Sequence, residues 1–201
     1  SGMNYPFRYA ANTLLLNDAG SEFLDSEYVV GVEPRKGGAT AAPLFELLCS
    51  SRDKDHRICE SSRGRRVIWG ALGSRSSVIF DLDQDGDLDI VTLEMNQPPM
   101  VLISNLSEKK ELNYLKVELV GDKSNRSGIG ATVRVIAGND VYTKIQDGKS
   151  GYISQSLYPL YFGLGNNTQV DRVEVTWPSG KHQTVDHDID LNQLITISES
   201  M

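Results

Sequence analysis

The sequence predicts an all-β protein with two parts, of which the first carries an acidic loop and the second is a regular β domain. Short runs rich in Val, Ile, Leu, Thr and Tyr alternate with Gly, Asn, Asp and Pro, which is typical of strands and turns. In residues 172–177 apolar and polar side chains alternate, the period-2 pattern of a strand with one buried face. Spacings of about 8–12 residues between the runs favour a sandwich or a barrel.

Length and composition exclude several classes of protein. The chain has 201 residues, of which 39% are hydrophobic and 23% charged, and its net charge is -7. This is enough for one large domain or two small ones with a core, and it excludes a disordered chain. No apolar run approaches the roughly 20 residues of a membrane-spanning helix. The acidic balance argues against a nucleic-acid partner.

The first part, residues 1–108, is expected to contain a hairpin, a short helix and strands that flank an acidic run. Residues 14–24 predict the hairpin, because two apolar runs flank an Asn-Asp-Ala-Gly turn. Residues 42–50 predict the helix, because Pro43 suits a first turn and the leucines would share one face. Strands are expected at residues 77–80, 90–93 and 100–103.

The second part, residues 109–201, is expected to be an antiparallel β-sandwich or barrel that follows the polar junction 107–110. Its clearest strand would bury Val173, Val175 and Trp177 and expose the residues between them. The expected strands are 114–120, 131–136, 141–145, 160–162, 170–177, 183–185 and 194–197.

The sharpest chemical feature is the acidic loop at residues 81–89, which holds five aspartates at alternate positions. Gly86 stands where a sharp turn requires a positive φ. Calcium takes about six to eight oxygen ligands at about 2.3–2.6 Å, and a loop that curls around the ion can supply them. The expected ligands are the side chains of Asp81, Asp83, Asp85 and Asp89 and the carbonyl of Asp87.

Two other interpretations of this loop stay open. A solvated acidic turn needs no ion, although its carboxylates repel one another by about 1 kcal/mol per close pair even in water. A catalytic pair of carboxylates needs acids on separate elements that face a cleft, which clustered loop acids fit poorly. An EF-hand is excluded, because position 12 of the loop is Thr92 and the flanking residues favour strands.

Cys49 and Cys59 flank a mostly polar stretch, which favours a local disulfide. Closing this loop would stabilise the fold by about 2–3 kcal/mol in the chain-entropy description. Free buried thiols and a metal site that includes His56 are the alternatives. A disulfide would indicate an oxidising compartment.

The acidic loop and its flanking strands resemble the calcium loop of FG-GAP/VCBS repeats, the blades of integrin-type β-propellers. The matching stretch is VIFDLDQDGDLDIVTL at residues 78–93, and NTLLLNDAGSEFLD at residues 12–25 is similar to the outer hairpin of such repeats. The second part resembles the ASPIC/UnbV domain in four blocks, at residues 124–131, 151–156, 161–165 and 173–180. The chain is thereby similar to the C-terminal part of the cartilage acidic protein group.

This resemblance implies a secreted, calcium-binding, β-rich protein, and it carries the ligand role onto the same five aspartates. FG-GAP propellers need several repeats and this chain holds fewer, so the remaining repeats of a longer chain are candidate partners. Residues 32–75 depart from the family as a Cys-bearing insertion, and residues 35–75 carry a net charge of +5.

We therefore expect an extracellular or periplasmic module in which calcium is structural and which binds a protein or carbohydrate at the cell surface, as in cell adhesion. The alternative is an accessory or catalytic portion of a larger secreted enzyme. No catalytic residue is assigned, because the sequence offers no nucleophile–base pair and no Gly-x-Ser-x-Gly elbow.

Two further groups of residues have both a functional and a structural interpretation. A basic cluster could grip an anionic glycan or phosphate, or form a solvated loop. An aromatic group could supply a carbohydrate-stacking platform, although strand packing is the simpler interpretation. These groups are Arg63, Arg65 and Arg66, and Tyr152, Tyr158, Tyr161 and Phe162.

Overall fold

The computed structural model describes residues 12–18, 20–30, 41–61, 63–71, 73–94 and 98–200, except for the side chains of residues 41, 42, 44 and 69–71. Strands dominate the described chain, so the all-β prediction is confirmed. Among these residues no helix is long and apolar enough to cross a membrane. The first part of the basic insertion, residues 32–40, lies outside the described residues.

Two compact units make up the chain. The first combines Ser1–Ser77 with Val91–Leu102, and the second combines Val78–Ile90 with Ile103–Met201. The acidic loop therefore belongs to the same unit as the C-terminal strands, whereas the sequence analysis assigns it to residues 1–108. Two strands contribute residues to both units, β5 (Ser74–Phe80) and β6 (Asp89–Glu94).

The first described elements form the predicted hairpin. Strands β1 (Leu15–Asp18) and β2 (Glu22–Asp25) pair antiparallel, and the short helix α1 (Glu27–Val30) follows. The side chain of Asn17 closes the turn by accepting a hydrogen bond of 2.8 Å from the Gly20 N–H. The hairpin is confirmed, and both of its strands are exposed along their whole length.

The predicted helix at residues 42–50 is wrong, because this segment is the strand β3 (Ala41–Leu48) paired antiparallel with β4 (Arg65–Ala71). The leucine spacing suits a helix face, but so short a helix is marginal by itself. Pairing with β4 supplies the backbone hydrogen bonds instead, and Pro43 lies at a register shift, where its missing N–H is tolerated. In the described insertion the helical turn is the 3-10 helix η2 (Arg57–Cys59).

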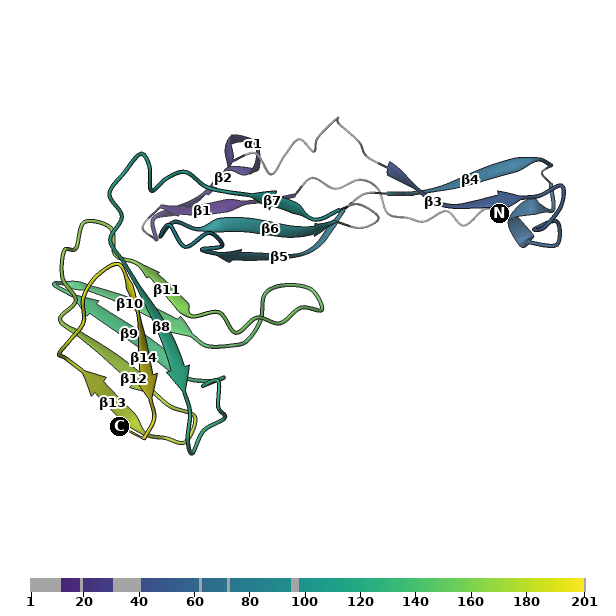
Figure 1. The fold of residues 1–201 in the computed structure, drawn as a ribbon. Helices are drawn as coiled ribbons and strands as arrows, with labels where there is room; N and C mark the ends of the chain where they lie inside the picture. The colour runs from purple at the N-terminus through teal and green to yellow at the C-terminus, as the bar shows by residue number, and fades with distance from the viewer. Residues whose placement is uncertain are drawn as a thin grey trace. The chain divides into compact units, whose positions relative to one another are not determined.

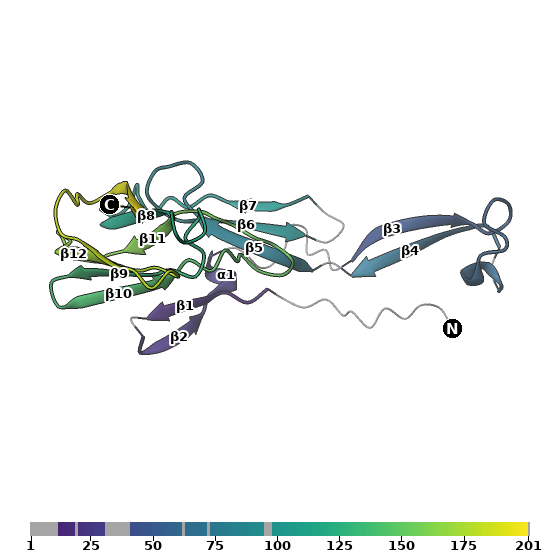
Figure 2. The ribbon, with the colours of Figure 1, turned by 90° about the horizontal axis from the view of Figure 1, so that it is seen from below.

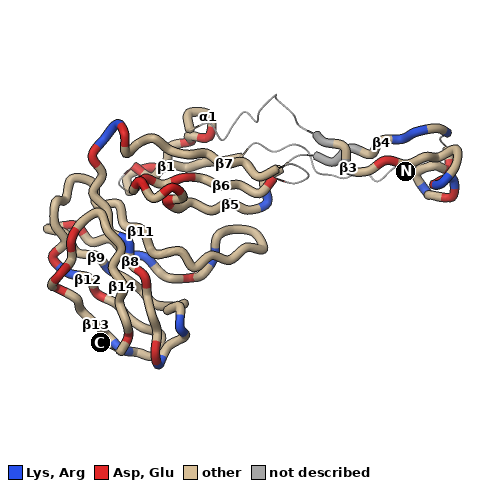
Figure 3. The backbone as a smooth tube through the Cα atoms, viewed as in Figure 1, with Lys and Arg blue, Asp and Glu red and all other residues tan. Residues whose placement is uncertain are grey.

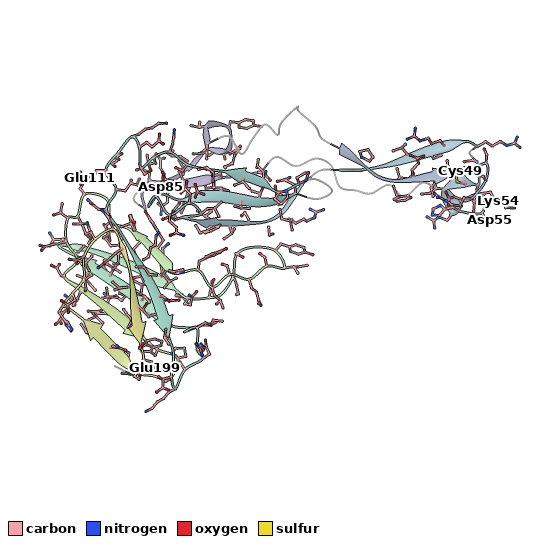
Figure 4. All side chains as sticks on the ribbon, viewed as in Figure 1. Cys49, Lys54, Asp55, Asp85, Glu111 and Glu199 are labelled. Atoms are coloured by element: carbon pink, nitrogen blue, oxygen red, sulfur yellow. A yellow bond between two sulfur atoms is a disulfide. The ribbon has the colours of Figure 1, made fainter. Side chains whose placement is uncertain are left out.

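A disulfide joins Cys49 to Cys59 in the connection between β3 and β4, with their Cα atoms 5.2 Å apart. Both cysteines are buried, and with Leu47 they form a small hydrophobic cluster. Figure 4 labels Cys49 at this end of the hairpin. The disulfide therefore lies in the small hydrophobic core of the described part of this hairpin.

The acidic loop lies between two strands of a three-stranded sheet. Its order is β5-β6-β7, with β7 at Met100–Leu102. The strands predicted at residues 77–80, 90–93 and 100–103 are confirmed, with ends that differ by a few residues. Residues 81–88 connect β5 to β6, so the loop is embedded in a β context as the sequence predicts.

The C-terminal strands form a β-sandwich of two sheets (Figures 1 and 2). One sheet has the order β10-β9-β12-β13 and the other the order β11-β8-β14, and neither closes into a barrel in the described chain. Every strand predicted in this part is confirmed. Their bounds are β8 (Tyr114–Val120), β9 (Thr132–Ala137), β10 (Asp140–Ile145), β11 (Leu160–Gly163), β12 (Arg172–Thr176), β13 (His182–Val185) and β14 (Gln193–Ser198).

The hydrophobic core of the sandwich takes side chains from both sheets. On β12 and just after it, Val173, Val175 and Trp177 are buried, which confirms the alternation predicted for this strand. From the other sheet, Leu115 on β8 and Phe162 on β11 join the same cluster. The core thus holds the two sheets together by burying apolar surface from each.

Strand β14 pairs with β8 in parallel, a departure from the antiparallel sandwich that the sequence predicts. Parallel pairing requires a long connection, which the intervening strands provide. Just after β14, the carboxylate of buried Glu199 accepts hydrogen bonds from the N–H groups of Asp122 (2.8 Å) and Ser124 (2.7 Å) and from the Ser179 hydroxyl (2.5 Å). Figure 4 labels Glu199 at this end of the sandwich.

Candidate metal centre

The acidic loop turns sharply at Gly86, whose φ is +97°. The Gly86 N–H donates to Oδ2 of Asp81 (3.1 Å), and the Gly86 carbonyl accepts from the Tyr161 hydroxyl (2.8 Å). A Cβ atom at this position would lie 2.6 Å from Cε1 of Tyr114, so both the φ and the close approach require glycine. Figure 3 shows the acidic residues of the loop gathered after β5.

Three of the five aspartates bring their carboxylates together. One oxygen each of Asp81, Asp83 and Asp89 lies within 4.8 Å of the others. Asp81 directly follows β5 and Asp89 begins β6, so the strands place two of the three, while Asp83 is exposed on the loop. No other group of three His, Cys, Asp or Glu side chains comes this close among the described residues.

The other two aspartates are held by the segment that follows β7. The Ser107 hydroxyl donates to Oδ2 of Asp85 (2.5 Å), and the Ser107 N–H donates to Oδ2 of Asp87 (2.8 Å). The Ser104 N–H donates to Oδ1 of Asp89 (2.8 Å), which ties the same segment to the three-aspartate cluster. The Asp85 carboxylate, labelled in Figure 4, is therefore engaged with Ser107 and lies outside that cluster.

Two carboxylate oxygens of the loop are buried without a hydrogen-bond donor, Oδ1 of Asp81 and Oδ1 of Asp87. An ionised oxygen in that position is costly unless a cation compensates it. Lys116 on β8 pairs with Oδ2 of Asp81, which leaves Oδ1 unpaired. The residues present thus fit a hard divalent cation such as calcium, which binds carboxylate and carbonyl oxygens.

The ionisation of the surrounding groups reflects a negative local potential. Although Asp83 is exposed, partial loss of hydration by its carboxylate raises its pKa, and the charge of Asp85 adds to the effect. The hydrogen bond from Ser107 lowers the pKa of Asp85. Burial raises the pKa of Tyr161 to about 12, and Tyr114 and the carboxylates of the loop contribute to the rise. Such a potential favours a bound cation.

The residues that support the loop carry no signal of that role in the sequence. Ser104, Ser107, Lys116 and Tyr161 contact the loop, and the distance along the chain ranges from 15 residues for the Ser104–Asp89 pair to 75 residues for the Tyr161–Gly86 pair. Tyr161 belongs to the matching block 161–165, but no local pattern gives any of these residues a role at the loop, because pairing of distant strands brings them there.

The structure also places the other candidate residues. Phe162 belongs to the core, whereas Tyr152 and Tyr158 are 66% and 46% exposed. In the basic cluster, Arg65 pairs with Glu46 at 2.7 Å. His56 caps η2 by accepting a hydrogen bond from the backbone of the following turn. His56 therefore has a structural role beside the disulfide in the described chain.

Comparison with known proteins finds a family match in the C-terminal part. The family described as ASPIC and UnbV matches residues 121–201. Cartilage acidic protein 1 of Mus musculus is 36% identical to this chain over 114 residues, and so is cartilage acidic protein 1 of Homo sapiens. Each match covers 52% of this chain and 16% of the relative, so the chain spans a small fraction of their length. The ASPIC/UnbV resemblance is confirmed for this part of the chain, and the FG-GAP/VCBS resemblance stays a prediction.

Proposed function

We propose that the acidic loop holds a calcium ion and that the protein is a calcium-stabilised interaction module. The observation that carries this proposal is a buried carboxylate oxygen without a donor inside the three-aspartate cluster, Oδ1 of Asp81. The oxygens of Asp83 and Asp89 beside Asp81 would complete most of an oxygen-rich shell.

The ion has a structural role in this proposal. The loop carries five carboxylates, of which Lys116 compensates one, so a divalent cation would remove much of the remaining repulsion. It would also fix the connection between β5 and β6 against the segment that contains Ser104 and Ser107. The calcium-bound loop then gives the second unit a rigid surface.

Two further properties belong to the same proposal. The Cys49–Cys59 disulfide supports an oxidising location, extracellular or periplasmic. The β1–β2 hairpin and the strand–loop–strand of β5 and β6 support the assignment of both segments to an FG-GAP/VCBS-type repeat. Exposed apolar side chains such as Leu16 and Phe23 on the hairpin suit a surface that further propeller repeats would cover.

Thermal unfolding in calcium and in EDTA tests the metal site. For a Kd of about 0.1 mM, 1 mM calcium adds about 1.4 kcal/mol of stability, or about 5 °C in Tm. Asp83→Asn is the informative variant, because Asp83 is exposed, and partial desolvation together with the charge of Asp85 raises its pKa. This variant should reduce the calcium response while leaving Tm in EDTA unchanged or slightly higher, since one repulsive charge is removed.

The matched control is Asp186→Asn, which removes an exposed carboxylate far along the chain from the loop. This control should keep the full calcium response. A Tm that does not respond to calcium in the unmodified protein would refute the metal site. An undiminished response in Asp83→Asn would show that the ligand assignment is wrong.

A further inference from the structure

A groove of about 920 Å³ lies within the second unit beside the acidic loop. Its walls come from the end of β5, the loop, β8, the end of β10, β11 and the start of β14. Pockets of about 300–1,000 Å³ hold small organic ligands, and such sites combine apolar walls with a few placed polar groups. The groove therefore has the size of a ligand site, and it adjoins the three-aspartate cluster, with which it shares Asp81.

One part of the groove consists of flat aromatic rings. The rings of Phe80 and Tyr158 are stacked with centroids 4.3 Å apart and an interplanar angle of 14°. Tyr114 and Tyr161 form a second stacked pair at 5.3 Å and 17°. Each ring is held in place by its partner, and Tyr158 is 46% exposed. A rigid, half-exposed ring provides a platform on which the C–H face of a sugar ring packs.

Cations line the same groove without carboxylate partners. Lys144 on β10 and Lys149 after it form no ion pair with the described residues, whereas Lys116 pairs with Asp81. Asp147 also lines the groove, but its Oδ1 accepts a hydrogen bond of 3.0 Å from the Lys149 backbone N–H. Lys144 also lies over the Phe162 ring, with its Nζ 5.9 Å from the ring centroid, and Asp147 keeps its charge. Beside the Lys116–Asp81 pair, the groove therefore carries two ammonium groups and one carboxylate, an excess of one positive charge that favours a negatively charged ligand.

A buried amide adds a directional group. Gln146 lines both this groove and a neighbouring cavity of about 240 Å³, and it is 6% exposed. Its side chain makes no hydrogen bond to the described residues, although an amide offers two donors and an acceptor. Its amide atoms are not among the fully buried, unpaired polar atoms of the described chain, so the amide is reachable from the groove and can pair with a ligand hydroxyl.

We propose that this groove binds an anionic oligosaccharide of the uronic-acid type. A sugar carboxylate would pair with Lys144 and Lys149, hydroxyl groups would pair with Gln146, and one pyranose face would cover Tyr158. An acidic peptide would satisfy the lysines, but the combination of a flat ring and a buried amide favours a hydroxylated ring. The inference rests on the interaction function proposed above and adds the class of ligand.

Isothermal titration calorimetry on the full chain tests the proposal with three probes. These are a galacturonic acid tetramer, an uncharged galactose tetramer and a hexaglutamate peptide. Titrations in EDTA prevent calcium from bridging the uronate, and they are repeated in 1 mM calcium. The charged tetramer should bind at least about tenfold more tightly than the neutral one, because its carboxylates form charge-assisted hydrogen bonds with the lysines that the neutral tetramer lacks.

Variants within and outside the groove locate the binding. Lys144→Gln with Lys149→Gln, Gln146→Leu and Tyr158→Ala should each weaken binding by about tenfold or more. The matched controls, Lys123→Gln and Tyr152→Ala, replace exposed residues of the same types outside the groove and should leave it unchanged.

Three results would overturn the proposal. These are no detectable uronate binding, equal affinity for the two tetramers, and equal effects of groove and control variants. Binding of hexaglutamate alone would replace the sugar with a peptide ligand. The calcium response of Tm, measured on the same protein, separates this outcome from a failure of the metal site.

Discussion

Replacing Gly86 with alanine tests whether the acidic loop requires its close approach to the aromatic pair. Two costs add at this position. The first is the positive φ of +97°, which costs an L-residue about 1–2 kcal/mol. The second is the contact of 2.6 Å between the new Cβ and Cε1 of Tyr114, whose ring is stacked on Tyr161 and has to move. Overpacking of this kind costs about 1–3 kcal/mol.

Gly180→Ala is the matched control, because Gly180 has a φ of +88° and a Cβ added there would meet no atom within 4 Å. We expect a loss of about 1–2 kcal/mol for Gly180→Ala and about 2–5 kcal/mol for Gly86→Ala. Guanidinium unfolding in EDTA measures both, with Trp69 replaced by Phe so that Trp177 alone reports on the second unit.

The steric contact with Tyr114 should appear as a larger loss of unfolding free energy in Gly86→Ala than in Gly180→Ala. Equal losses for Gly86→Ala and Gly180→Ala would refute the steric argument and leave backbone strain alone. A Tyr114→Leu background should relieve the contact and bring the cost of Gly86→Ala close to that of Gly180→Ala. A cost that stays unchanged in that background would contradict the proposed contact with the ring.

Two further predictions concern Glu199 and the disulfide. Burial raises the pKa of Glu199, but hydrogen bonds, chiefly from Ser179 and Ser124, outweigh burial and lower it from 4.5 to about 2. The ionised carboxylate of Glu199 therefore adds stability above pH 4.5 that is lost as the pH falls towards 2. Glu199→Gln should lower the free energy of unfolding at pH 7, and this loss should shrink between pH 4.5 and 2. A loss that stays constant with pH in denaturant titrations would contradict this reasoning. Reducing the Cys49–Cys59 disulfide should add the mass of two hydrogens, and an unchanged mass would exclude the bridge. Reduction should also destabilise the β3–β4 hairpin by about 3 kcal/mol. Hydrogen exchange on β4 measures this loss, with β8 as the unaffected control.

The sequence predicts the strands of the sandwich well because each of them carries its own signal. On β12 the alternation of Val173 and Val175 with polar neighbours follows directly from one buried face. The segment around Leu47 carries a helical spacing, and its strand conformation depends on β4, which lies beyond the disulfide-bonded connection. Local pattern fails there because a distant partner decides the conformation.

The same distinction applies to the candidate metal centre. The aspartates and Gly86 are contiguous, so their spacing alone predicts an oxygen-rich turn. The division into a cluster of three and a pair held by Ser107 depends on a segment beyond β7. Lys116 reaches Asp81 only after β8 is in place, and no local pattern contains that information.

The parallel pairing of β14 with β8 has a consequence for synthesis of the protein. Strand β8 is central in its sheet, yet β11 and β14 are both translated later, and one edge of β8 stays open until residues 193–198 have left the ribosome. An open strand edge is a template for association with other nascent chains. The second unit therefore closes late, and we expect chaperones to protect β8 during that interval. A premature stop before β14 would leave this edge open for the lifetime of the chain.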